Sequence, residues 1–248
     1  MKKTLLFGGI FLVLTACVMK TKSSKEPAKL ALSPGEQKAF TLEENGLDYY
    51  LYLPENYNKA DALPFMLFLH GAGERGDSIE QLLQWGPPKK VANGESMPFI
   101  IASPQCPTNK YWPQDDQLDR LVALMDHVEA NYKVDPKRVY VTGLSMGGYG
   151  TWYLSARYND RIAAAAPICG GGELDSAAAI AEVPIWAFHG AKDPVVPLVR
   201  SSEMVDAVNA AGGNAKLTIY PDEEHLSWRP AYANDSLYTW LLSHSLDR

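Results

Sequence analysis

The run Gly143–Gly147, of sequence Gly-Leu-Ser-Met-Gly, constrains the fold of this chain more than any other feature. It follows a short strand-like run, residues 138–142, and precedes residues 146–158, which have helical character. A serine between a strand and a helix needs a tight turn, and small residues two before and two after it let the chain close. Such a turn lifts the hydroxyl of Ser145 above the carboxyl edge of a sheet and directs the helix N-terminus toward it. This order makes an ordinary glycine-rich turn a poor explanation.

Apolar runs recur along the chain and predict further strands. They lack polar alternation, as strands buried on both faces do. The expected strands are residues 64–69, 99–102, 138–142, 162–168, 184–188 and 217–220. Helical patterns fall between or after them, at residues 118–128, 146–158, 199–211 and 230–246. Strands that alternate with helices predict a mostly parallel sheet covered on both faces.

An antiparallel hairpin is expected at the start of the domain. Residues 39–44 and 47–53 flank Asn45-Gly46, a pair typical of a type I′ turn. With the serine turn and the strand order, this predicts an α/β protein with the α/β-hydrolase fold. The fold has a mostly parallel central sheet, an N-terminal antiparallel hairpin and helices on both faces.

A serine hydroxyl at neutral pH needs a base before it can act as a nucleophile. In this fold the acid and then the base follow the nucleophile in the chain, on loops after the last strands. Asp193 follows the penultimate expected strand, and His225 follows the last. We therefore expect Ser145 as nucleophile, His225 as base and Asp193 as the acid that orients the imidazole. Asp175 and Asp222 remain alternative acids.

Two backbone N–H groups are expected to bind the oxyanion of a tetrahedral intermediate. One belongs to Met146, directly after the serine, and the other to Ala72, in the loop His70–Gly73 after the first buried strand. Small residues in that loop let the backbone approach a substrate. His189 ends a buried strand, and we expect it to be structural.

Five motifs in combination resemble a bacterial family of secreted esterases and predicted peptidases, related to feruloyl esterases and carbohydrate esterase family 1. They are Leu69–Gly76, Ser103–Pro107, Gly143–Gly150, Pro167–Gly172 and His225–Trp228. The resemblance covers nearly all of residues 40–245. It implies ester hydrolysis through the three residues named above, often on acylated plant polysaccharide or its fragments. One departure is Glu224, where the family pattern has a small residue before the histidine.

Other classes fit less well. A dienelactone hydrolase has a similar fold but a cysteine nucleophile, so Ser145 argues against it. A peptidase of the prolyl oligopeptidase group usually carries a further domain, and a non-enzymatic binding module would have lost a member of the triad. A phospholipase or carboxylesterase acting on short acyl esters remains an alternative. Because His-Glu-x-x-His and Cys-x-x-Cys patterns are absent, no metal or cofactor is expected. A net charge of −6 without a basic cluster argues against nucleic acid as a partner.

Three tryptophans in loop-like segments, Trp85, Trp112 and Trp228, are candidates for stacking on a phenolic acyl group or a sugar ring. Buried loop packing is an equally good interpretation of each one. Cys106 and Cys169 either form a disulfide or remain buried free thiols.

The N-terminus resembles that of a bacterial lipoprotein. Residues 1–16 combine two lysines, an apolar run too short to span a bilayer comfortably, and small residues before Cys17. We expect a signal peptide at 1–16, a lipid on Cys17 with a flexible tether at 17–37, and a catalytic domain at 38–248. An ordinary secretory signal or an uncleaved anchor helix is the alternative. Val18 in place of an aspartate favours the outer membrane, which places the enzyme in the cell envelope.

Overall fold

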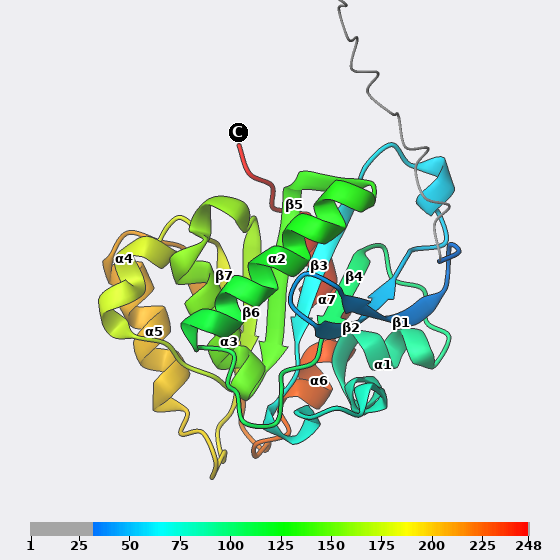
Figure 1. The fold of residues 1–248 in the computed structure, drawn as a ribbon. Helices are drawn as coiled ribbons and strands as arrows, with labels where there is room; N and C mark the ends of the chain where they lie inside the picture. Colours follow the sequence, from blue (N-terminus) through cyan, green and yellow to red (C-terminus); the bar gives the residue numbers. More distant parts are fainter. Residues whose placement is uncertain (1–31, 248) are drawn as a thin grey trace, which may run out of the picture. The chain divides into compact units, whose positions relative to one another are not determined.

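A single eight-stranded sheet forms the centre of the part of the chain that the computed structural model describes, residues 32–247 (Figure 1). The strands are β1 (Gln37–Leu42), β2 (Leu47–Tyr52), β3 (Leu63–Leu69), β4 (Ile100–Pro104), β5 (Val134–Leu144), β6 (Ala164–Ile168), β7 (Ile185–Gly190) and β8 (Ala215–Tyr220). They lie in the order β1-β2-β4-β3-β5-β6-β7-β8. Strands β3 to β8 run parallel, while β2 pairs antiparallel with β1 and β4. The α/β-hydrolase prediction is confirmed.

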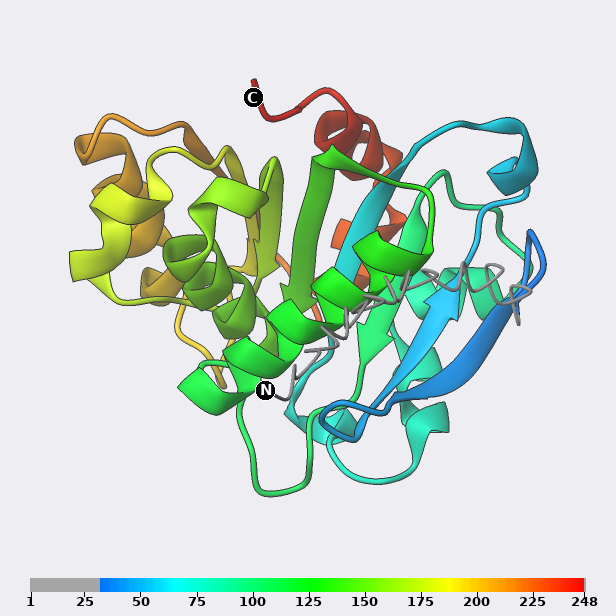
Figure 2. The same ribbon diagram turned by 45° about the horizontal axis from the view of Figure 1, so that its top comes forward.

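Helices cover both faces of this sheet. They are α1 (Gly86–Ala92), α2 (Asp115–Asn131), α3 (Met146–Arg157), α4 (Ala177–Ile180), α5 (Val199–Ala210), α6 (Trp228–Ala233) and α7 (Asp235–Leu242). Figures 1 and 2 show α2 and α3 in front of the sheet and α6 and α7 behind it. The long helix predicted over residues 230–246 is divided at Asn234, whose side chain accepts a hydrogen bond from the N–H of Ser236 at 3.0 Å. Asn234 thereby caps α7 as a new helix.

The residues of β3 show why the sheet needs two helical layers. Leu67 and Leu69 pack in the core on the side of α2, α3 and α5, whereas Met66 and Phe68 pack on the side of α1, α6 and α7. Successive side chains of a strand point to opposite faces, so a strand with apolar residues throughout is stable only when both faces are covered. Burying each such side chain stabilises the fold by about 1.5–3 kcal/mol.

The N-terminal hairpin forms as predicted, but its turn differs. Leu42 pairs with Leu47, and the carbonyl of Leu42 accepts hydrogen bonds from the N–H groups of both Asn45 and Gly46. A type I′ turn requires two residues with positive φ, and in this turn only Gly46 has one, at 66°. The type I′ prediction is therefore wrong, and the connection is a longer loop.

The folded unit begins at Leu32, earlier than the predicted boundary at residue 38. Leu32 is 3% exposed and belongs to the core, and the N–H of Gly35 donates to the carbonyl of Leu53. The tether predicted over residues 17–37 is thus wrong for its last six residues. The predicted signal peptide and Cys17 lie outside the described residues. Within residues 32–247, no helix combines the length and apolar character needed to cross a membrane.

The close packing of α3 against β3 gives a stability prediction. A Cβ atom added to Gly147 would lie 1.9 Å from the carbonyl oxygen of Leu69, whereas one added to Gly73 would meet nothing within 4 Å. We predict that Gly147→Ala lowers the free energy of unfolding by about 3 kcal/mol, because backbone must move to relieve the clash. The control Gly73→Ala should change it by less than about 0.5 kcal/mol. Equal midpoints in urea denaturation for the two variants would contradict this packing.

Candidate active site

The turn between β5 and α3 holds Ser145 in an unusual backbone conformation. Its φ is 52° and its ψ is −115°, a region that residues other than glycine rarely adopt. Two hydrogen bonds hold it there: the N–H of Ser145 donates to the carbonyl of Ile168 at 2.9 Å, and its own carbonyl accepts from Tyr149 at 3.0 Å. Strain of this kind persists only where the surroundings determine it. Here it raises the hydroxyl above the carboxyl edge of the sheet.

Ser145, His225 and Asp193 form one chain of hydrogen bonds, as their order in the sequence predicts. Nε2 of His225 lies 3.0 Å from Oγ of Ser145, and Nδ1 lies 2.7 Å from Oδ2 of Asp193. A carboxylate can only accept, so Nδ1 carries the proton and Nε2 is left to accept from the serine hydroxyl. The arrangement therefore provides a base aimed at Ser145.

The side chain of Asp193 is fully buried, and its second oxygen is also occupied. Oδ1 accepts hydrogen bonds from the N–H groups of Val195 and Val196, at 2.8 and 2.9 Å. A buried carboxylate is costly unless such donors surround it. Because both donors bind Oδ1, they orient Oδ2 toward the imidazole of His225.

His189 supports the same carboxylate from the end of β7. Its Nε2 donates to the carbonyl of Val196 at 2.9 Å and lies 3.4 Å from Oδ2 of Asp193. Burial lowers the pKa of His189, and its Nδ1 lies 2.7 Å from the hydroxyl oxygen of Ser201, which in turn donates to the carbonyl of Gly170 at 2.9 Å. His189 is buried, as its predicted structural role requires. Its contacts with Asp193 and Val196 show that it supports the carboxylate that orients His225.

The alternative acids do not take this position. Asp222 is exposed and pairs with Lys192, Oδ1 to Nζ at 2.8 Å. Asp175 is exposed on the short turn Leu174–Ser176. The carboxylate hydrogen-bonded to His225 belongs to Asp193.

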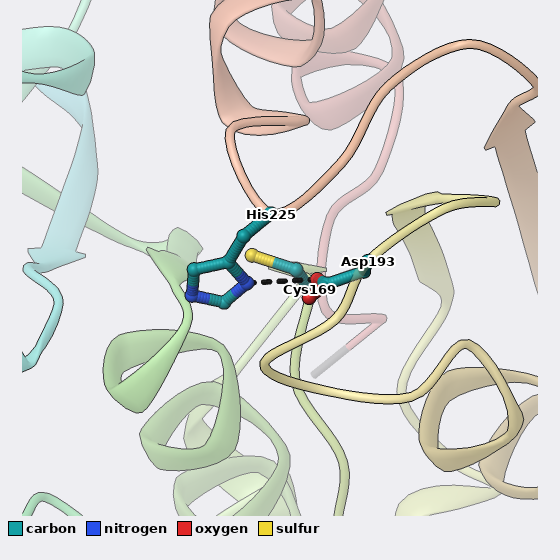
Figure 3. Close-up of side chains that lie close together, drawn as sticks. All are labelled: Cys169, Asp193 and His225. Carbon is teal, nitrogen blue, oxygen red and sulfur yellow. Dashed lines mark hydrogen bonds and ion pairs between the residues drawn. The ribbon is translucent and has the colours of Figure 1, made fainter.

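Cys169 follows β6 and lies beside the imidazole and the carboxylate (Figure 3). The sulfur, nitrogen and oxygen atoms of Cys169, His225 and Asp193 lie within 4.8 Å of one another. A metal ion there would have to displace the hydrogen bond that orients the imidazole. Cys106 and Cys169 are both buried free thiols, so the disulfide alternative is excluded. Burial raises the pKa of the Cys169 thiol to about 12, which keeps it protonated at neutral pH.

The loop after β3 is held in place by His70. Nε2 of His70 accepts from the N–H of Cys106 at 2.9 Å, so Nδ1 carries the proton and donates to the carbonyl of Gly71. The indole N–H of Trp112 donates to the carbonyl of His70 at 3.1 Å. These bonds fix the backbone that presents Ala72 toward the serine.

A cavity of about 330 Å³ opens at Ser145, with Ala72 and Met146 among its lining residues. As the first residue of α3, Met146 has an N–H without an acceptor in its own helix. Tyr111, Pro113 and Tyr149 complete the lining, and none of them belongs to the predicted site residues. Of these three, only Tyr149 could have been predicted from the sequence, because it follows Ser145 by four residues and so lies on the same face of the helix.

The three tryptophans have different environments. Trp112 is fully buried beneath the His70 loop. The prediction that it stacks on a substrate is therefore wrong, and the alternative interpretation, buried loop packing, is confirmed. Trp228 is 6% exposed, and Trp85 is half-buried. Both line a second cavity, distinct from the one at Ser145.

Burial lowers the pKa of His70 from 6.5 to about 4, which gives a pH prediction. The unfolded chain binds the proton between these two values and the folded chain does not, so stability rises with pH across this window. We predict that the stability advantage of the wild type over His70→Asn shrinks by up to about 3 kcal/mol between pH 7 and pH 4. Urea denaturation at each pH measures it. A difference that stays constant with pH would contradict a neutral buried His70.

Comparison with known proteins places this geometry in a family. The model of the dienelactone hydrolase family matches residues 104–236, more than half of the chain. The chain is 28% identical over 202 residues to the bifunctional acetylxylan esterase/xylanase of Neocallimastix patriciarum, covering 79% of this chain and 28% of the relative. It is 26% identical over 170 residues to a protein of Aspergillus terreus (strain NIH 2624 / FGSC A1156) named "Probable feruloyl esterase C", covering 65% of this chain and 60% of the relative.

Among solved structures, a thermostable esterase matches with a TM-score of 0.73 at 32% identity, covering 85% of this chain and 63% of that one. This chain spans less than two thirds of each of these three proteins. The predicted resemblance to esterases related to feruloyl esterases is confirmed. The chain belongs to the dienelactone hydrolase family. The prediction that Ser145 argues against a dienelactone hydrolase is wrong for the family, because the match spans position 145 with a serine there.

Proposed function

We propose that this member of the dienelactone hydrolase family is a serine esterase that cleaves carboxylic esters through an acyl-enzyme on Ser145. The observation that carries the proposal is the continuous hydrogen-bonded chain from Ser145 through His225 to Asp193. A hydroxyl, a base and an orienting carboxylate in this geometry form a nucleophile that works at neutral pH.

In the first half of the reaction, Oγ of Ser145 bonds to the ester carbonyl carbon while its proton moves to Nε2 of His225. Asp193 stabilises the imidazolium that results. The N–H groups of Met146 and Ala72 bind the negative carbonyl oxygen. His225 then donates its proton to the leaving alcohol as the ester C–O bond breaks, which leaves the acyl group on Ser145.

The second half repeats these steps with water. His225 removes a proton from the water as its oxygen bonds to the acyl carbon, and the same proton returns to Oγ of Ser145 when the acyl–serine bond breaks. The products are a carboxylic acid and the regenerated enzyme. Each proton that leaves one oxygen is delivered to another through the same ring nitrogen, so no cofactor is needed.

The substrate that we propose is an acylated carbohydrate or a hydroxycinnamoyl ester derived from plant polysaccharide. The names of the acetylxylan and feruloyl esterase relatives support this class. The cavity at Ser145 supports it as well, since Tyr111 and Tyr149 give it aromatic walls. Aromatic side chains suit the flat face of a phenolic acyl group.

Variants of the triad test the proposed function. Ser145→Ala, His225→Ala and Asp193→Asn should each lower kcat on 4-nitrophenyl acetate and methyl ferulate by roughly 10³-fold or more, because the three groups act as a unit. Initial rates measured with folded variants, checked by circular dichroism, give the result.

Matched controls come from a half-buried histidine and an exposed aspartate that lie outside the hydrogen-bonded chain. His127→Ala on α2 and Asp222→Asn beside the His225 loop should leave kcat within twofold, since neither side chain contacts Ser145 or His225. Retained turnover by Ser145→Ala would overturn the proposal, and so would a preference of the wild type for a peptide amide over every ester.

We also propose that residues 1–16 are a signal peptide and that a lipid on Cys17 anchors the enzyme in the cell envelope, at the outer membrane. The small residues before Cys17 and Val18 after it support this proposal. Cys17→Ser should move the full chain from the membrane fraction to the soluble fraction of cells. Unchanged membrane association of that variant would point instead to an uncleaved anchor helix.

A further inference from the structure

A cavity of about 350 Å³ lies between α1 and α6. Helix α6 begins three residues after His225 in the chain. Its walls include Trp85 and Trp228, together with Lys89 and Arg229. A volume of this size accommodates one or two sugar rings or a ligand of similar size. None of the steps proposed above uses it.

The wall of this cavity is in contact with the proposed base. The rings of Trp228 and His225 meet edge to face with centroids 5.2 Å apart, and those of Trp85 and Trp228 meet in the same way at 5.8 Å. His225 is therefore separated from the cavity by a single indole.

The chemistry assigns a substrate half to each cavity. The leaving oxygen must lie near Nε2 of His225 to receive its proton. The alcohol half of the ester therefore lies on the His225 side of the reacting carbon, and Trp228 is the indole in contact with His225. The acyl half occupies the cavity at Ser145, whose lining includes the oxyanion donors Ala72 and Met146.

Two cations distinguish the cavity between α1 and α6 from the cavity at Ser145. Nζ of Lys89 lies 4.9 Å and Cζ of Arg229 lies 5.1 Å from the centroid of the Trp85 ring. Both residues are exposed, and within residues 32–247 neither has a carboxylate within 4.0 Å. Lys90 in the same wall differs, because it pairs with Glu95 at 2.6 Å.

Two unpaired cations on a chain with a net charge of −6 create a local positive site. The indole of Trp85 helps to hold both of them at one place. The guanidinium group in particular binds carboxylates through paired hydrogen bonds.

We infer that this cavity binds the alcohol half of the ester, and that Lys89 and Arg229 hold a carboxylate carried by that half. The ligand class is an acidic sugar, a uronic acid unit, esterified on a hydroxyl group. The inference rests on the proposed esterase function and specifies its substrate. It also changes the role of Trp85, whose ring positions cations instead of stacking on a neutral sugar.

A matched pair of substrates tests the inference. The methyl glycosides of glucuronic acid and glucose, each with one acetyl group on O3, differ only in a carboxylate against a hydroxymethyl group. For the wild type, kcat/KM should be about three- to tenfold higher for the acidic substrate, and rising salt should reduce the preference.

In the double variant Lys89→Gln, Arg229→Gln the ratio of kcat/KM for the acidic substrate to that for the neutral substrate should fall to about one. The loss should lie in KM, with kcat unchanged, because the cations bind both ground and transition states.

Lys216→Gln is the matched control. Nζ of Lys216 also lies over an indole, 3.4 Å from the centroid of the Trp186 ring, but at the amino ends of β7 and β8, away from Ser145. This variant should keep the full preference for the acidic substrate.

A wild-type ratio of one or below would overturn the inference, as would a double variant that keeps the preference. Turnover of 4-nitrophenyl acetate with no hydrolysis of either glycoside would overturn it too, while leaving the esterase function intact. Failure to hydrolyse 4-nitrophenyl acetate would instead count against the proposed function itself.

Discussion

The position of the Ser145 hydroxyl depends on close contacts between the backbone of the turn that holds Ser145 and the backbone of neighbouring strands. Glycines on both sides of the serine allow β5 and α3 to approach their neighbours more closely than any side chain permits. A Cβ at Gly143 would lie 2.4 Å from the carbonyl oxygen of Gly147, and one at Gly148 would lie 2.3 Å from that of Ile168. This packing, with the hydrogen bond from Ser145 to Ile168, holds the serine at a positive φ. The nucleophile is therefore oriented by the sheet itself.

The acid and the base are tied together by a second close approach. A Cβ at Gly190 would lie 2.1 Å from the carbonyl oxygen of Glu224, so the loops after β7 and β8 meet where a side chain has no room. The N–H of Lys192 also donates to the carbonyl of Glu223 at 3.0 Å. This contact sets the distance between Asp193 and His225. It also shows that Glu224, the departure from the family pattern, contributes through its backbone, while its side chain is exposed.

Local pattern and chain order predicted much of the molecule. The serine turn, the parallel strands and the positions of Asp193 and His225 all follow from short-range signals, because each residue comes directly after a strand whose end must lie at one edge of the sheet. The errors lie where distant segments decide the outcome. Leu32 belongs to a core cluster whose members come from the whole length of the domain, and the buried indole of Trp112 donates to the carbonyl of His70, 42 positions earlier in the chain.

The second cavity was also beyond sequence reasoning, for the same reason. Lys89 and Arg229 are separated by 140 positions in the chain, and only the packing of α1 beside α6 brings both cations to the ring of Trp85. The sequence indicated Trp85 and Trp228 as candidate binding residues, but it could not show which side chains surround them. Aromatic residues in loops have no periodic pattern that reveals their neighbours.

The acyl-enzyme tests the proposed mechanism most directly, since its formation requires the nucleophile, the base and the oxyanion donors together. Rapid acid quenching after the protein is mixed with 4-nitrophenyl acetate, followed by peptide mass spectrometry, locates any acetyl group that is bound covalently. We predict a single acetyl group on the peptide that contains Ser145, and none on the same peptide of Ser145→Ala. Steady turnover with that peptide unmodified, or with the acetyl group on another residue that turnover requires, would contradict it.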